Sequence, residues 1–324
     1  MARLVLGAAL VTRAQLALAV DWAVAKGQAR DGLRLCRGAG DPRWIAAALN
    51  VLSETALRAG QTQEAVARAD EAVAVARSAG DGWNEGYALG TRAAIAARVG
   101  KLAEARQLAE ASVTVMRRID QQWGVGRALL GLGDLARLQD HPGEAHSRYV
   151  EALTIFRQVG ARPQMARCLA GLGRVAMDLD APEQARMHLT HSIQLSQDTG
   201  ARLGISRGLE AFAMLAVQEG LPERAVRLAA AATALRQTTG LPPIPDARTD
   251  GYLASARHLG EAAVGRLWAR GLAMNSEAAV ALALQPAPRA APADHTPVLA
   301  IVRASETAGQ HSSPLPPDQS SAPP

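Results

Sequence analysis

Small and apolar residues recur along the chain with a period of 40 residues, and each period contains two amphipathic segments. In the third copy, the first segment places four such residues on one face of a helix: Leu129, Leu132, Gly133 and Ala136. The second segment does the same with Ala145, Tyr149, Ala152 and Ile155. Spacings of three and four residues are typical of one helix face. The pattern therefore predicts a pair of helices joined by a tight turn in every copy.

Five columns of residues keep this register over five copies, and each column holds one kind of residue. The columns are Leu49, Leu89, Leu129, Leu169 and Leu209; Ala56, Ala96, Ala136, Ala176 and Ala216; Ala65, Ala105, Ala145, Ala185 and Ala225; the small residues Ser53, Ala93, Gly133, Gly173 and Ala213; and the apolar residues Val75, Val115, Ile155, Leu195 and Leu235. One helix pair cannot bury its own apolar face, so we expect neighbouring copies to stack into a continuous core.

Glycine and aspartate occupy the expected turns in the same register. They are Gly60, Gly100, Asp140, Asp180 and Gly220 within the copies, and Gly80, Asp120, Gly160, Gly200 and Gly240 between them. Helix ends often need a left-handed residue or a capping side chain, which these residue types supply. Pro142, Pro182 and Pro222 each follow a turn residue by two positions. We expect helices to begin there, because a missing N–H costs least in the first turn.

The order of these columns resembles the tetratricopeptide repeat, whose usual period is about 34 residues. The longer period resembles the form found in certain bacterial regulators and in kinesin light chains. The extra residues should lengthen the helices by about one to two turns. The resemblance implies an all-α, tetratricopeptide-type solenoid of antiparallel helix pairs. It also implies a scaffold that binds a protein or peptide ligand, without enzymatic activity.

A narrower resemblance lies in residues 252–284, which end in LGEAAVGRLWARGLAMNSEAAVALAL. This segment is similar to the one that closes the repeat domain of LuxR-type and related signal-transduction ATPase regulators. The match rests on Gly260, Trp268, Gly271, Ser276, Glu277 and Ala278. It implies a role in bacterial signalling or transcription regulation. The chain contains no G-x-x-x-x-G-K-[ST] loop, so ATP binding does not carry over, and a split or non-functional remnant of a larger regulator remains an alternative.

These patterns divide the chain into four parts. Residues 1–43 are N-terminal helices with a degenerate first repeat, 44–242 hold five repeats, and 243–284 are capping helices. Residues 285–324 hold nine of the 17 prolines together with many Ala and Ser. Such a segment cannot bury enough apolar surface to fold, so we predict a disordered tail.

Composition and charge narrow the choice of partner. The net charge is +5, and its 35 basic residues are scattered among 30 acidic ones. The positive net charge makes a basic solenoid that binds nucleic acid a second hypothesis. The absence of runs of like charge does not favour this hypothesis. No apolar stretch predicts a membrane span. Cys36 and Cys168 form neither a disulfide framework nor a zinc pattern, so we expect a cytoplasmic protein.

No cofactor, metal or catalytic residue is predicted. No G-x-S-x-G elbow occurs, and neither cysteine lies in a known catalytic signature. His146, His188 and His191 could approach one another, but no Cys, Asp or Glu completes a recognisable metal site. Trp44, Trp83 and Trp123 recur near repeat starts, and we interpret them as packing between repeats rather than as stacking on a ligand.

The candidate ligand-binding residues come from a column two positions before the first Leu of each repeat: Ala47, Tyr87, Arg127, Arg167 and Arg207. Asn50, Asp134 and Arg174 fall on neighbouring columns of the same expected groove. Guanidinium groups are fixed two-pronged donors that could hold carboxylates of a peptide. The alternative is that these arginines pair with acidic residues along and between the helices.

Overall fold

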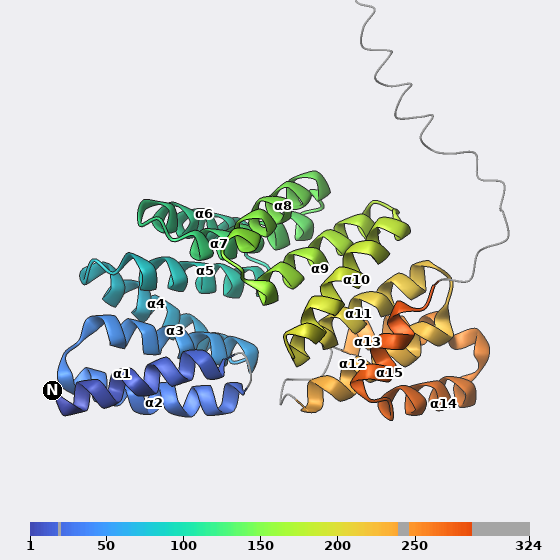
Figure 1. Cartoon of the computed structure of the whole chain (residues 1–324), viewed down its shortest axis with the longest axis horizontal. Helices are drawn as coiled ribbons and strands as arrows, with labels where there is room; N and C mark the ends of the chain where they lie inside the picture. The colour runs from blue at the N-terminus through green and yellow to red at the C-terminus, as the bar shows by residue number, and fades with distance from the viewer. Residues whose placement is uncertain (19–20, 239–245, 287–324) are drawn as a thin grey trace, which may run out of the picture. The chain divides into compact units, whose positions relative to one another are not determined.

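The computed structural model describes residues 1–18, 21–238 and 246–286, and every regular element in these ranges is a helix (Figure 1). The helices are α1 (Ala2–Ala17), α2 (Trp22–Ala39), α3 (Pro42–Arg58), α4 (Thr62–Ser78), α5 (Gly82–Arg98), α6 (Leu102–Arg118), α7 (Gln122–Leu138), α8 (Pro142–Gln158), α9 (Arg162–Asp178), α10 (Pro182–Asp198), α11 (Arg202–Gln218), α12 (Pro222–Thr238), α13 (Asp246–Ser255), the 3₁₀ turn η1 (Arg257–Leu259), α14 (Glu261–Leu272) and α15 (Ser276–Leu284).

Residues 1–285 form one compact unit. The predicted disordered tail lies, from residue 287 onward, outside the described residues, as does the turn residue Gly240. None of the described helices is long and apolar enough to cross a membrane.

The helices from α3 to α12 form five pairs of equal size. Each helix has 17 residues, and the links between them have three, which accounts for the period of 40. The predicted lengthening of the helices is therefore confirmed. Pro142, Pro182 and Pro222 begin α8, α10 and α12, as the sequence predicts.

Left-handed residues end the helices at the predicted turns. Gly100 has a φ of 79°, and Asp120, Asp140 and Asp180 have φ values of 52°, 58° and 53°. Beside Gly100, the N–H of Lys101 donates to the carbonyl of Ala96 over 2.9 Å. This bond satisfies a carbonyl that the end of α5 would otherwise leave without a partner. The same hydrogen bond recurs in the equivalent turn of the following repeat, from the N–H of His141 to the carbonyl of Ala136.

The sequence columns form the core of the stack. All five members of the Ala65 column are fully buried: Ala65, Ala105, Ala145, Ala185 and Ala225. The column that begins with Val75 is only partly buried along its whole length. Small side chains let the two helices of a pair approach closely, while larger ones from the next pair fill the remaining space. Figure 1 shows the pairs following one another in chain order.

The first helices of the pairs form one continuous surface. α3 contacts α5, α5 contacts α7, α7 contacts α9, and α9 contacts α11. We call the surface that these five helices share the first-helix face. All the candidate ligand-binding residues lie on these five helices.

The C-terminal helices cover the last pair. α14 packs on α12 so closely that a Cβ at Gly271 would lie 2.4 Å from the carbonyl oxygen of Arg227. The guanidinium of Arg224 donates to the carbonyls of Leu282 and Ala283 over 2.8 and 2.7 Å. These bonds satisfy carbonyls at the C-terminal end of α15, where a positive charge is favoured.

Candidate ligand-binding face

Three aromatic rings from two repeats lie together on the first-helix face. Trp83 and Tyr87 are one turn apart on α5, and Trp123 occupies the equivalent of Trp83 on α7. The ring centroids of Trp83 and Trp123 are 5.8 Å apart, and those of Tyr87 and Trp123 are 6.4 Å apart with ring planes only 5° from parallel. The predicted packing of these tryptophans between repeats is confirmed. The rings are nevertheless only half-buried, so they also present a surface to solvent.

Tyr87 is held by a partly buried carboxylate, that of Glu54. Its hydroxyl donates to Glu54 over 2.5 Å, and Arg58 donates to the other carboxylate oxygen over 2.6 Å. Burial opposes ionisation of Glu54, but the charges of Arg58 and Arg127 and these hydrogen bonds lower its pKa to about 2. Burial and the neighbouring Glu54 raise the pKa of Tyr87, which keeps its hydroxyl protonated. Tyr87 of the aromatic cluster is therefore hydrogen-bonded to a carboxylate that stays ionised at neutral pH.

Arg127 completes this network from α7. Its guanidinium lies 3.9 Å from the centroid of the Tyr87 ring, as a cation–π contact requires. The same group donates to the Tyr87 carbonyl over 3.2 Å and to the Thr91 hydroxyl over 2.9 Å. These contacts join α7 to α5. Arg127 therefore has a packing role that the sequence did not reveal, in addition to its place in the candidate column.

Asn50 is buried on α3 and keeps one polar atom without a partner. Its Nδ2 donates to the main-chain carbonyl and to Oδ1 of Asn84 over 3.2 and 3.0 Å. Asn84 in turn donates its Nδ2 to Asp81 over 2.7 Å. Both atoms facing Asn50 are acceptors, so its amide cannot turn round without opposing oxygen to oxygen. Oδ1 of Asn50, on a side chain that is 3% exposed, has no hydrogen-bond donor among the described residues.

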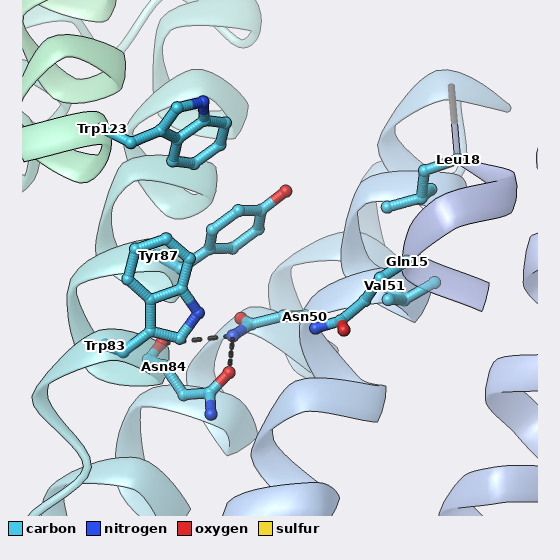
Figure 2. A pocket seen from close by; sticks show the side chains of 8 residues that line it. All are labelled: Gln15, Leu18, Asn50, Val51, Trp83, Asn84, Tyr87 and Trp123. Atoms are coloured by element: carbon cyan, nitrogen blue, oxygen red, sulfur yellow. Dashed lines mark hydrogen bonds between the residues drawn. The ribbon is translucent and has the colours of Figure 1, made fainter. Parts of the chain in front are cut away.

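A cavity of about 280 Å³ lies between α1 and this cluster. Figure 2 shows the side chains around it, with Trp83, Tyr87 and Trp123 on one side and α1 on the other. Its lining residues are Gln15, Leu18, Asn50, Val51, Trp83, Asn84, Tyr87 and Trp123. No side chain in this lining carries a charge at neutral pH. The cavity therefore suits an uncharged group.

Three arginines form a second cluster further along the first-helix face. Arg167 and Arg174 are two turns apart on α9, and Arg207 is the equivalent of Arg167 on the adjoining α11. Within the described residues, none of the three has a hydrogen bond or a carboxylate within 4.0 Å. The alternative that all these candidate arginines pair with acidic residues does not describe this cluster.

Arg207 is exposed to solvent although atoms of several helices surround it. Burial among the surrounding helices and the like charge of its neighbours, that of Arg167 first, lower the pKa of Arg207 to about 9. The group still carries its charge at neutral pH, and its side chain remains exposed at the surface. The charge of Glu210 opposes this repulsion only in part, and an anion bound here would relieve the rest.

Asp134 has a partner within its own repeat. Its Oδ1 accepts a hydrogen bond of 2.7 Å from the hydroxyl of Tyr149 on α8. Burial and the charge of Asp134 raise the pKa of Tyr149, so this hydroxyl remains a donor. Asp134 therefore holds the two helices of its pair together.

His146 lies on α8, and His188 and His191 lie on α10. Burial and the nearby His146 and His191 lower the pKa of His188, which favours its neutral form. Among the described residues, no group of three or more His, Cys, Asp or Glu side chains could hold a metal ion.

The structure thus separates the sequence candidates into two groups. Asn50, Tyr87 and Arg127 lie around the aromatic cluster, whereas Arg167, Arg174 and Arg207 form the arginine cluster. The sequence did not reveal that Trp83 and Trp123 line a cavity, although their spacing of 40 in a chain with 3% aromatics was a usable signal. Gln15 and Leu18 carried no signal, because α1 lies outside the regular repeats.

Comparison with known proteins gives the class of this fold. The family model of the tetratricopeptide repeat matches residues 85–158. A search of curated protein sequences finds no match to the chain. The matched range holds α6, α7 and α8 with most of α5, and it includes Tyr87 and Trp123 but not Trp83.

Solved structures match over most of the chain. A Rap protein complexed with Competence and Sporulation Factor matches with a TM-score of 0.56 and 12% identity, over 77% of this chain and 72% of that one. Aspartyl phosphate phosphatase F from Bacillus subtilis matches with a TM-score of 0.54 and 12% identity, over 81% and 72%. BtubC (BKLC) from P. vanneervenii matches with a TM-score of 0.50 and 17% identity, over 72% and 93%.

At these identities the likeness establishes the fold. Together with the family match and the regular helix pairs, it confirms the predicted tetratricopeptide-type solenoid. Residues 85–158 therefore carry tetratricopeptide repeats, and the helices from α3 to α12 continue the same arrangement of helix pairs.

Proposed function

We propose that this protein is a non-catalytic scaffold whose first-helix face binds an extended, acidic peptide segment of a partner protein. The observation that carries the proposal is the arginine cluster. Arg167, Arg174 and Arg207 lie on adjoining helices, and within the described residues none of the three has a hydrogen bond or an ion pair. A guanidinium group binds a carboxylate through two parallel hydrogen bonds, which adds orientation to affinity.

The repeat geometry favours an extended ligand. Each repeat presents the same columns of side chains at the same position on its first helix, so successive repeats offer contacts at regular intervals. A peptide can place acidic side chains at such intervals with little strain. Holding the peptide would also remove the mutual repulsion of the three guanidinium groups, because each would gain a carboxylate partner.

The regulatory setting is part of the same proposal. The closing segment around Trp268 and Gly271 resembles that of LuxR-type regulators, which supports a role in signalling or transcription control. The Rap protein of similar fold was solved with Competence and Sporulation Factor, which is consistent with a scaffold that holds a regulatory partner. The proposal itself rests on the arginine cluster and not on these likenesses.

Selection of random peptides displayed on phage against the immobilised full chain tests the proposal. We expect the selected peptides to be enriched in Asp and Glu. The triple variant Arg167→Gln, Arg174→Gln and Arg207→Gln should lose this enrichment, because it removes the three unpaired charges. Circular dichroism of the variant checks that the helices remain.

A matched control keeps the net charge of the triple variant. Arg30→Gln, Arg118→Gln and Arg157→Gln remove three exposed arginines from α2, α6 and α8, on the second helices of their pairs. This control should still select acidic peptides. If both triple variants lose the enrichment equally, only the overall charge attracts the peptides and the proposed face is wrong.

Nucleic-acid binding is the second candidate, because the same three unpaired arginines could contact phosphates. This hypothesis predicts that the protein binds a duplex of any sequence and that its affinity falls steeply with salt concentration. A gel shift with a duplex of random sequence at low salt distinguishes the two functions. A shift that the Arg167, Arg174 and Arg207 variant abolishes would favour nucleic acid over an acidic peptide.

A further inference from the structure

The cavity beside Asn50 points to a more specific feature of the ligand. We propose that this cavity receives one uncharged aromatic side chain that carries a hydrogen-bond donor on its ring edge, as tryptophan and tyrosine do. The inference rests on the proposed peptide-binding function, and the aromatic residue belongs to the same peptide whose acidic residues reach the arginine cluster.

The first argument is the unpaired acceptor of Asn50. A buried polar atom without a partner costs free energy, and native structures rarely keep one. The hydrogen bonds to Asn84 fix the amide, so Oδ1 can only accept, and Asn50 is one of the residues that line the cavity. An N–H or O–H donor on the ligand would satisfy it.

The second argument is the chemistry of the walls. Trp83, Tyr87 and Trp123 supply aromatic faces, and Leu18 and Val51 supply aliphatic ones. Aromatic rings pack well against such walls in offset or edge-to-face arrangements. The lining has no carboxylate to pair with a cation, and Arg127 already lies over Tyr87. A ligand ammonium or guanidinium group is therefore disfavoured.

The third argument is size and rigidity. Ligand cavities for whole small molecules span about 300–1,000 Å³. A volume of about 280 Å³ falls just below that range and suits one large side chain. Tyr87 is fixed by Glu54 and Arg127, so this wall needs little reordering when a ring enters. Preorganised walls increase affinity because less entropy is lost on binding.

Isosteric probes test the cavity without any peptide. Ligand-observed ¹⁹F NMR can measure the affinity of 5-fluoroindole and of 5-fluorobenzofuran for the full chain. The two rings have nearly the same shape, but only the indole carries an N–H donor. We expect the indole to bind on the order of tenfold more tightly, because the benzofuran leaves the Asn50 acceptor unpaired.

A blocking variant locates the binding. Gln15 is exposed on α1 and lines the cavity, so Gln15→Trp should fill it with little risk to folding. Arg13→Trp is the control, because Arg13 is exposed on the same helix and does not line the cavity. We expect Gln15→Trp to abolish binding of 5-fluoroindole and Arg13→Trp to preserve it.

The outcomes separate this inference from the proposed function. Equal affinity of the two probes, binding of neither, or binding that survives Gln15→Trp would each overturn the aromatic site. The variant lacking Arg167, Arg174 and Arg207 should bind 5-fluoroindole as the wild type does, because these residues do not line the cavity. If the wild-type chain selects no acidic peptides but still binds 5-fluoroindole, the proposed function is wrong and this aromatic site remains.

Discussion

The hydroxyl of Tyr149 lies 2.7 Å from Oδ1 of Asp134, and this hydrogen bond fixes a ring that fills the space between two repeats. A Cβ at Gly133 on α7 would lie 2.7 Å from Cε1 of the ring. A Cβ at Gly171 on α9 would lie 2.6 Å from Cζ. The fully buried Tyr149 therefore joins three helices, and the glycines make room for it.

Gly171→Ala should destabilise the protein by roughly 1–3 kcal/mol, because the ring of Tyr149 has no open space into which it could move. Urea unfolding followed by circular dichroism measures the loss. Gly131→Ala is the control, since Gly131 is helical with nothing within 4 Å of its Cβ position. That control should be neutral or stabilising by up to about 1 kcal/mol. Equal effects of the two substitutions would contradict the packing described.

The turns offer a pair of substitutions with opposite effects. Gly100→Ala should destabilise by about 1 kcal/mol, because a side chain is disfavoured at its φ of 79° although space is open around it. Asp140→Gly should have the opposite sign, because Asp140 is a non-glycine residue at a φ of 58°. Thermal unfolding of the two variants beside the wild type checks both signs. A stabilising Gly100→Ala would show that this turn is not left-handed.

The ionisation of Glu54 should make the free energy of unfolding depend on pH at acidic pH. Its pKa is lowered from an ordinary value of 4.5 to about 2, so the folded state favours the ionised form. The resulting stabilisation is complete above pH 4.5 and is lost as the pH falls toward 2. At pH 7, Glu54→Gln should therefore cost on the order of 2–3 kcal/mol.

The difference between Glu54→Gln and the wild type should shrink between pH 4.5 and pH 2. Tryptophan fluorescence during urea unfolding can follow it, because Trp83 and Trp123 lie in the same cluster as Tyr87. Glu183→Gln on α10 is a suitable control, since Glu183 is exposed and has no ion pair among the described residues. A difference that is independent of pH would show that Glu54 acts through shape and not through charge.

The repeat and its turns could be predicted from the sequence because they depend on local physics. A helix face repeats every few residues, and a left-handed turn needs glycine or a residue such as Asp140. The partners of individual side chains could not be predicted in this way. The column that contains Arg127 and Arg167 looks uniform in sequence, yet the first is bonded to Tyr87 and Thr91 and the second is unpaired.

The reason for that failure is the choice of partner across repeats. Arg127 finds an aromatic ring and a hydroxyl on α5 because position 87 holds Tyr and position 91 holds Thr. Arg207 faces the equivalent residues of α9, where positions 167 and 171 hold Arg and Gly. The arginine of this column therefore packs against its neighbours at Arg127, whereas at Arg207 it meets another positive charge. Likewise, the cavity depends on Leu18 and Gln15 of a helix outside the repeat register.

This contrast between Arg127 and Arg167 gives the last prediction. Arg127→Gln should lower stability by about 1–3 kcal/mol, because it removes a cation–π contact, two hydrogen bonds and a charge that keeps Glu54 ionised. Arg167→Gln should leave stability unchanged or raise it, because it removes repulsion on Arg207 and breaks no hydrogen bond. Thermal unfolding measures both.

Residues whose role is to bind a ligand often lower the stability of the unbound protein. A wild-type arginine that is neutral or unfavourable for folding therefore fits a binding residue. If Arg167→Gln destabilises the protein as much as Arg127→Gln, then Arg167 has a partner in solution and the arginine cluster is structural.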